Sequence, residues 1–312
     1  CMAFSQEYFP KNDGVKAEND NYTALTGATL HLSPSETISG ATLLIRHGEV
    51  VAAGTSVRIP ENSVVMDLDG KHIYPSFIDV FSDYGIEKPK RARGSGRSSQ
   101  YDPTREGYYW NDHIRAEQDA VGSYSFDKKE AASLRKLGFG VVNSHIADGI
   151  ARGTGVTLAL NEEGNEGKRI LQDEAGQYFS FEKSITSRQS YPTSLMGAMA
   201  LLRQMYHDAE WYAEGHASTT DRSLEALLEN KGLTQFFAAD DHRHIPGADG
   251  IGDAFGIQYV IRGGGREYEN VAEVKASGAT VVIPLNFPAA FDVSNPYQAG
   301  YITLEDMRHW NQ

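Results

Sequence analysis

The stretch YPSFIDVFSD, from Tyr74 to Asp83, decides the fold of this chain. It stands between two parts of the sequence that have different patterns. Before it, short β-rich runs are separated by turn residues, which predicts a small sheet or sandwich. After it, strand-like runs alternate with helix-like runs, which predicts parallel strands joined by right-handed crossovers. The stretch is therefore expected to open a second, larger domain.

The smaller domain is expected over residues 20–72, as a β-sandwich. Ser63–Leu68 alternates in hydrophobicity, as a half-buried strand does. Asp69 and Gly70 are expected to form a hairpin turn after it. The other expected strands are Thr23–Leu32, Thr42–Arg46, Glu49–Ala53 and Lys71–Tyr74.

The larger domain is expected over residues 73–312. Its further strands are expected at Phe139–His145, Val156–Leu160, Gln177–Phe181, Thr234–Ala239, Ile257–Arg262 and Thr280–Leu285, and its helices at Ser194–Trp211, Leu224–Leu228, Gly250–Phe255 and Glu267–Ser277. A TIM-like barrel and a doubly wound sheet both satisfy this alternation. A (β/α)₈ barrel needs eight strands, and the sequence offers about five or six. We therefore expect that the natural chain continues, or that a partner or a second copy covers the open strand edge.

Composition limits the classes of function. The chain has 312 residues, of which 40% are hydrophobic and 23% charged, as in ordinary globular proteins. Its formal net charge of −13 argues against a nucleic acid partner, because phosphate binding needs clustered Lys and Arg. No apolar run approaches the roughly 20 residues of a membrane span.

Cys1 is the only cysteine, which excludes intramolecular disulfides and thiolate metal clusters. Residues 1–19 are read as an N-terminal arm or the remainder of a secretory signal, with Ala3 and Ser5 as the small residues before cleavage. Two other readings are an acylated Cys1 in a lipoprotein and a sequence that begins within a longer protein. The expectation is export to the periplasm, the cell surface or the medium.

Several motifs resemble the amidohydrolase superfamily. ATLLIRHGEVVAAG (41–54) and PENSVVMDLDGKHIYPSFID (60–79) are similar to the N-terminal sandwich of imidazolonepropionase-like members, and YPSFIDVFSD resembles their PGFIDxHxH signature. The loop 101–120 and the segment 189–215 resemble the first half of long secreted tandem amidohydrolases of Bacteroidetes. The resemblance implies a small N-terminal β-sandwich followed by an incomplete TIM-like (β/α) barrel, in the α/β class.

The same resemblance implies a hydrolase of carbon–nitrogen bonds other than linear peptide bonds, acting on a small-molecule substrate. In the family, Zn²⁺ or another divalent metal activates water. Here the metal motifs are degenerate. Phe81 and Asp83 stand in place of the two signature histidines, and Arg262 and Gly263 stand where a later histidine is expected.

The candidate site residues follow from these positions. Asp83 and His145 are the catalytic candidates, because both follow barrel strands, where TIM-barrel sites gather. His242, His244 and Asp83 are the candidate metal ligands; the two histidines, two residues apart in an extended segment, would face one side. The structural alternatives are solvated loop residues and a hydrogen-bonded histidine.

Three functions remain open from the sequence. The first is a metal-dependent amidohydrolase. The second is a catalytically silent module of the same fold that scaffolds or gates an active unit elsewhere in a longer chain. The third is an extracellular binding protein that uses the aromatic loop around Tyr108, Tyr109 and Trp110. A loop of this length in a compact domain is functional or disordered.

Overall fold

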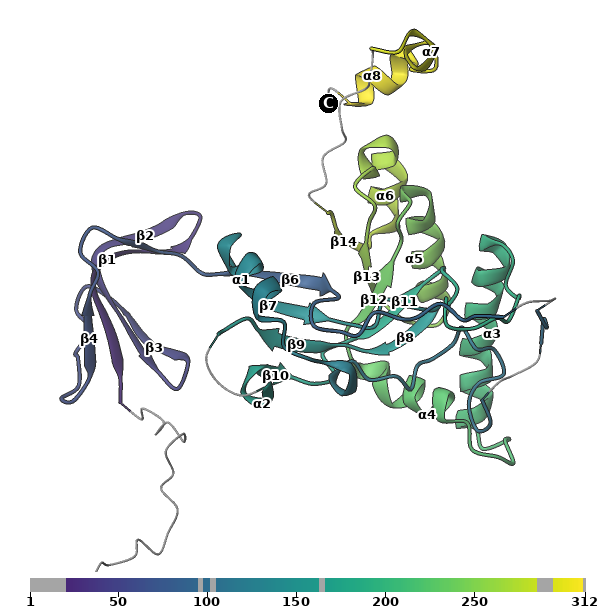
Figure 1. Cartoon of the computed structure of the whole chain (residues 1–312), viewed down its shortest axis with the longest axis horizontal. Coiled ribbons are helices and arrows are strands. Elements are labelled where there is room, and N and C mark those ends of the chain that lie inside the picture. The colour runs from purple at the N-terminus through teal and green to yellow at the C-terminus, as the bar shows by residue number, and fades with distance from the viewer. Residues whose placement is uncertain (1–20, 95–97, 102–104, 163–165, 285–293, 311–312) are drawn as a thin grey trace, which may run out of the picture. The chain divides into compact units, whose positions relative to one another are not determined.

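The computed structural model describes residues 21–94, 98–101, 105–162, 166–284 and 294–310 (Figure 1). Cys1 and the expected export segment lie outside these ranges, as does Leu285 at the end of an expected strand. The chain divides into two compact units, Cys1–Ser76 and Phe77–Gln312, and each is described by itself. Within the described ranges, no helix is both long and apolar enough to cross a membrane.

The N-terminal unit is a five-stranded sheet. Its strands are β1 (Thr23–Ser33), β2 (Glu36–Arg46), β3 (Glu49–Gly54), β4 (Val64–Asp67) and β5 (His72–Ile73). The order is β3-β2-β1-β4, and β5 also pairs with β1. The β2–β3 hairpin turns at His47 and Gly48, whose φ angles of 51° and 84° suit a tight two-residue turn.

The hairpin expected at Asp69 and Gly70 is wrong. Both β4 and β5 pair with β1 in the parallel sense, so this turn carries the chain onward beside β1 without reversing it. A turn dipeptide marks a break between two extended runs, but it does not fix their pairing. The core of this unit is small: its buried cluster contains Ala28, Leu30 and Ala41, and Ala24 on β1 is also fully buried.

The C-terminal unit contains two sheets. The first has the order β10-β9-β7-β6, and the second β14-β13-β12-β11-β8. The strands are β6 (Phe77–Ser82), β7 (Phe139–Ser144), β8 (Ala151–Thr154), β9 (Val156–Ala159), β10 (Ile170–Gln172), β11 (Gln177–Ser180), β12 (Gln235–Ala238), β13 (Tyr259–Arg262) and β14 (Thr280–Val282).

Helices alternate with the parallel strands, as expected. They are α1 (Lys128–Lys136), α2 (Glu166–Arg169), α3 (Leu195–Ala213), α4 (Arg222–Glu229), α5 (Ile245–Ala254), α6 (Val271–Ser277), α7 (Pro296–Ala299) and α8 (Leu304–Trp310). Short 3₁₀ helices lie at η1 (Val121–Ser123), η2 (Asn230–Gly232), η3 (His242–His244) and η4 (Glu267–Asn270). Helices α3, α4 and α5 pack around the second sheet, over one large apolar core (Figure 1).

The strands β6 and β7 are parallel, and so are β11 to β14. The pair β8 and β9 departs from the expected alternation. Strand β9 runs antiparallel to β7, and β8 runs antiparallel to β11, so these consecutive strands belong to different sheets. The fold is therefore mixed α/β, with an N-terminal β domain and, within the described residues, no closed barrel.

Candidate functional site

The candidate site lies at the carboxyl ends of β6, β7, β11, β12 and β13. Side chains at these ends gather at one edge of parallel strands, which is where TIM-like folds carry their chemistry. The residues that follow the strands are Asp83 after β6, His145 after β7, Glu182 shortly after β11, and Asp240 shortly after β12. Arg262 is the last residue of β13.

Phe81 belongs to an aromatic cluster, which we define as Phe81, His145, Tyr178 and Phe236. The His145 and Tyr178 rings stack 4.0 Å apart, and the Tyr178 and Phe236 rings stack 4.8 Å apart. Phe81 meets His145 edge-on at 4.4 Å and Tyr178 at 5.4 Å. Edge-to-face and offset aromatic pairs of this kind stabilise beyond simple area burial. The residue in the first histidine's place is therefore part of a packed apolar cluster.

His145 is only 2% exposed. Its Nε2 lies 3.5 Å from a guanidinium nitrogen of Arg152, and its Nδ1 has no hydrogen-bond partner within the described part of the chain. Burial, with the nearby charge of Arg152, lowers the pKa of His145 well below its usual range. The imidazole is therefore neutral and out of contact with solvent, so it has no route to a proton on a substrate.

Two arginines stand beside the aromatic cluster. Arg152, the second residue of β8, is 5% exposed and donates from Nε to the Gly149 carbonyl at 3.0 Å. Arg262 pairs with Asp240, and its guanidinium carbon lies 5.7 Å from the centre of the Phe81 ring. Burial lowers the pKa of Arg152, and the carboxylates of Glu182, Asp240 and Asp148 oppose this shift. The edge of the strands thus carries guanidinium charge.

Asp83 is exposed and makes no ion pair with another described residue. Its carbonyl accepts a hydrogen bond from the Ile86 amide at 3.2 Å, which closes a turn after β6. No described contact joins its carboxylate to His145 or His242. The structure therefore does not bring the three candidate residues into one constellation.

His242 and His244 lie in η3, so the expectation of an extended segment is wrong here. Side chains two apart on a 3₁₀ helix point in different directions, because each residue turns the chain by about a third of a circle. Nδ1 of His242 is 3.6 Å from Asp241 and 3.9 Å from Glu269. His244 instead meets the Phe181 ring edge-on, at 5.8 Å between centroids.

The residues present do not fit a divalent metal. Among the described residues, no three His, Cys, Asp or Glu side chains converge on one point. A zinc hydrolase generally supplies three protein ligands around an open position. Phe81 offers no donor atom, and the Asp240 carboxylate is already paired with Arg262. The described strand ends therefore lack the donor set of a zinc hydrolase.

A polar network fixes the loops beside this edge. Asp148 accepts hydrogen bonds from the Ile185 amide at 2.7 Å and from the hydroxyls of Ser184 and Thr186. Nδ1 of His113 accepts from the Ser184 amide at 3.1 Å, so its Nε2 donates to the Gln189 carbonyl at 3.0 Å. Residues 105–120 of the aromatic loop are thereby held against residues 184–189. In this part of the loop, the alternative of disorder does not apply.

The sequence pointed to Arg262 only as the replacement of a histidine, and it gave no role to Arg152. The partners Tyr178 and Phe236 were missed. A usable signal existed, because both expected strands contain a glutamine followed by two aromatic residues, at Gln177–Phe179 and Gln235–Phe237. Neighbouring parallel strands bring such equivalent positions side by side, and Tyr178 is indeed paired with Phe236.

The structure resembles a crystal structure of an amidohydrolase from Thermotoga maritima MSB8. The TM-score is 0.66 at 19% sequence identity, and the match covers 93% of this chain and 76% of the other. The fold is that of an amidohydrolase. At this identity the likeness concerns the fold alone. No protein-family model and no curated protein matches the sequence.

Other solved structures match more weakly. A prolidase complexed with N-methylphosphonate-L-proline gives a TM-score of 0.38 at 13% identity, covering 93% of this chain and 72% of the other. An N-acyl-D-glutamate deacylase from Bordetella bronchiseptica, complexed with zinc and a phosphonate inhibitor, gives 0.34 at 14%, covering 85% and 58%. These scores are too low to bear on the site.

Proposed function

We propose that this chain is an amidohydrolase-fold module without a metal centre at its strand ends, which scaffolds or gates a hydrolytic unit elsewhere in a longer chain. One observation carries the proposal. The Phe81 ring is packed against His145 and Tyr178, with the Arg262 guanidinium beside it. An aromatic ring and a fixed cation fill the positions that a metal and its ligands would need.

The remaining groups at this edge do not make an acid–base site. A general base must reach the proton that it removes, directly or through one water. His145 is buried and its Nε2 faces Arg152, whereas Asp83 is exposed and its carboxylate pairs with no described residue. The positions of His145, Arg152 and Asp83 are thus explained by packing and charge balance, and they do not favour activation of a water molecule.

The experiment is a metal and activity assay on the purified chain. We expect substoichiometric zinc after dialysis against zinc and removal of free ion, measured by mass spectrometry. We also expect no hydrolysis of N-acyl amino acids, proline dipeptides or hydantoins. Stoichiometric zinc that disappears in His242→Ala would contradict the proposal, and His216→Ala, an exposed histidine, is the matched control.

The second candidate is a hydrolase of carbon–nitrogen bonds in a small-molecule substrate, dependent on Zn²⁺ or another divalent metal. It is favoured by the fold match and by His242, which lies near both Asp241 and Glu269 after β12. Hydrolysis of any of the three substrate classes that is abolished by His242→Ala and by chelation would select this function.

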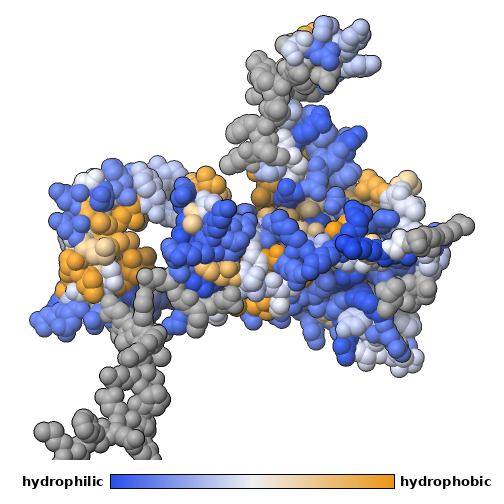
Figure 2. All heavy atoms as spheres, viewed as in Figure 1, coloured by the Kyte–Doolittle hydropathy of each residue, from blue (hydrophilic) through white to orange (hydrophobic). Residues whose placement is uncertain are grey.

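Exposed apolar side chains on the N-terminal unit support a scaffolding role. Val50 on β3 and Val64, Val65 and Met66 on β4 are 62%, 43%, 56% and 51% exposed, and Figure 2 shows apolar surface over this unit. Large exposed apolar patches mark interaction sites in soluble proteins. We propose that the rest of a longer chain, or a second copy, covers this surface. If light scattering shows that the wild-type chain is a monomer, and that Val65→Glu does not change its molar mass, a second copy does not cover this surface.

A further inference from the structure

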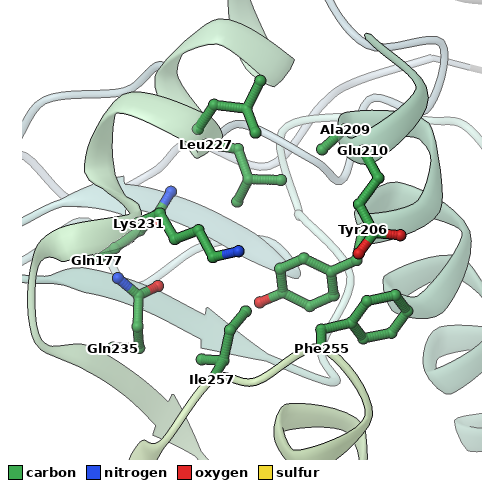
Figure 3. A pocket seen from close by; sticks show the side chains of 10 residues that line it. Gln177, Tyr206, Ala209, Glu210, Leu227, Lys231, Gln235, Phe255 and Ile257 are labelled. Atoms are coloured by element: carbon green, nitrogen blue, oxygen red, sulfur yellow. The ribbon is translucent and has the colours of Figure 1, made fainter. Parts of the chain in front are cut away.

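A small cavity lies at the other end of the strands, away from the candidate site. Its volume is about 30 Å³, and it is lined by α3, α4 and the first residues of β11 and β12, Gln177 and Gln235 (Figure 3). Leu227 and Phe255 contribute apolar walls. At roughly 10–15 Å³ for each water, the interior holds about two or three non-hydrogen atoms.

Gln177 lies in the wall of this cavity with its amide unpaired. The residue is fully buried, and neither Nε2 nor Oε1 has a hydrogen-bond partner among the described residues. A buried amide without partners destabilises a protein, because it loses its hydrogen bonds to water and gains none in return. Gln235 is different, since its Nε2 donates to the carbonyls of Asn230 at 2.9 Å and Leu233 at 2.8 Å. The Gln177 amide therefore lacks an acceptor for its Nε2 and a donor for its Oε1, and one group that both donates and accepts could supply both.

Two opposite charges also line the cavity without meeting. Figure 3 shows the Lys231 amine reaching into the pocket toward Tyr206. Lys231 makes no ion pair with a described residue, and Glu210 pairs only with His207, at 3.3 Å. The Lys231 amine and the Glu210 carboxylate are thus more than 4 Å apart, although both residues line the same pocket. A molecule that carries both charges close together can bridge this gap.

We propose that this cavity binds a free α-amino acid with a short polar side chain. Its carboxylate would contact Lys231 and its ammonium group Glu210, both near solvent. A side-chain hydroxyl would reach inward toward the Gln177 amide, because a hydroxyl can donate and accept at once. The Tyr206 hydroxyl is already paired with that of Tyr259, so the wall behind it is closed. Larger side chains do not fit the interior volume.

The test compares the binding of L-serine with that of acetate and of methylammonium, which each carry one of its two charges. Binding is measured by calorimetry and by thermal unfolding of the whole chain. We expect saturable serine binding, a rise in the unfolding temperature through linkage, and no binding of acetate or methylammonium alone at the same concentrations. Lys231→Gln and Glu210→Gln should each weaken serine binding about fivefold, as for one exposed ion pair. Lys136→Gln, an exposed lysine on α1, should leave binding unchanged.

A further variant separates ligand binding from folding. Gln177→Met removes the unpaired amide, so the free protein should be at least as stable as wild type, and the serine-induced rise should shrink. Absence of serine binding to the wild-type chain would overturn the proposal. It would equally be overturned by acetate binding as tightly as serine, or by full binding in Lys231→Gln. None of these results depends on hydrolytic activity.

Discussion

Arg152 places a guanidinium in the interior of the C-terminal unit, next to a histidine that stays neutral. An arginine does not lose its proton in proteins, so its charge must be offset by its surroundings. The carboxylates of Glu182, Asp240 and Asp148 supply this offset. His145 then avoids a second buried cation by remaining unprotonated.

The neutral His145 predicts loss of stability in acid. Its pKa is lowered on folding, so the unfolded chain binds a proton below about pH 6.5 that the folded chain excludes. Stability is then complete above pH 6.5 and falls as the pH drops toward the folded pKa, by up to about 1.4 kcal/mol per pH unit. His145→Phe, which keeps the ring contacts, should flatten this slope in denaturant unfolding between pH 7 and pH 5.

His113 contributes to the same slope, because burial lowers its pKa too. The quantity to compare is therefore the difference in the pH dependence of stability between wild type and His145→Phe. His216→Gln, at an exposed histidine, provides the control for the removal of an imidazole. Identical slopes for His145→Phe and wild type would show that folding does not lower the pKa of His145.

Asp148 is expected to be structural. It accepts from the Ile185 amide and from two hydroxyls that join the loop after β7 to the loop after β11. Removing the acceptor leaves these donors unsatisfied, so Asp148→Ala should lower the free energy of unfolding by about 2–3 kcal/mol. Asp148→Asn keeps one acceptor oxygen and should lose less. Equal stability of Asp148→Ala and wild type would refute this role.

At the scale of elements, β8 and β9 join the two sheets, and Gly155 is the residue between them. A Cβ atom there would lie 2.5 Å from the Tyr178 ring and 3.0 Å from the Ser144 carbonyl. Since tightly packed cores tolerate extra atoms poorly, Gly155→Ala should destabilise the C-terminal unit by about 1–3 kcal/mol in urea unfolding.

Gly250 gives the matched control for this substitution. It lies in α5, is exposed, and would place a Cβ atom in open space. Alanine is the better helix former, so Gly250→Ala should stabilise by about 0.5–1 kcal/mol. A Gly155→Ala variant as stable as wild type would mean that the two sheets can move apart at this point.

Local sequence patterns predict some elements of this fold and leave others unpredicted. The small β domain and the alternation of strands with helices were predictable, because both leave a local hydrophobic period and turn residues. The antiparallel insertion of β8 and β9 was not, since β8 reads Ala-Arg-Gly-Thr, without a strand-like hydrophobic pattern, and the short apolar run of β9 does not specify its direction. The contacts of Phe81 with His145 and Tyr178 join residues far apart in the chain, and only the fold brings them together.

At the scale of the whole molecule, the two units differ greatly in core size. The N-terminal core is built on Ala28, Leu30 and Ala41, whereas the C-terminal unit has two larger clusters of buried residues. Small domains bury a lower fraction of their surface and are correspondingly marginal in stability. We therefore expect two calorimetric transitions, with the N-terminal unit unfolding at the lower temperature.

Substitutions in each core assign the two transitions. Leu30→Ala removes the largest buried side chain of the N-terminal core and should lower only the first transition, by about 2–4 kcal/mol in free energy. Ile261→Ala, in the fully buried part of β13, should lower only the second. A single transition shifted by both variants would show that the units unfold together, which would require an extensive interface between them.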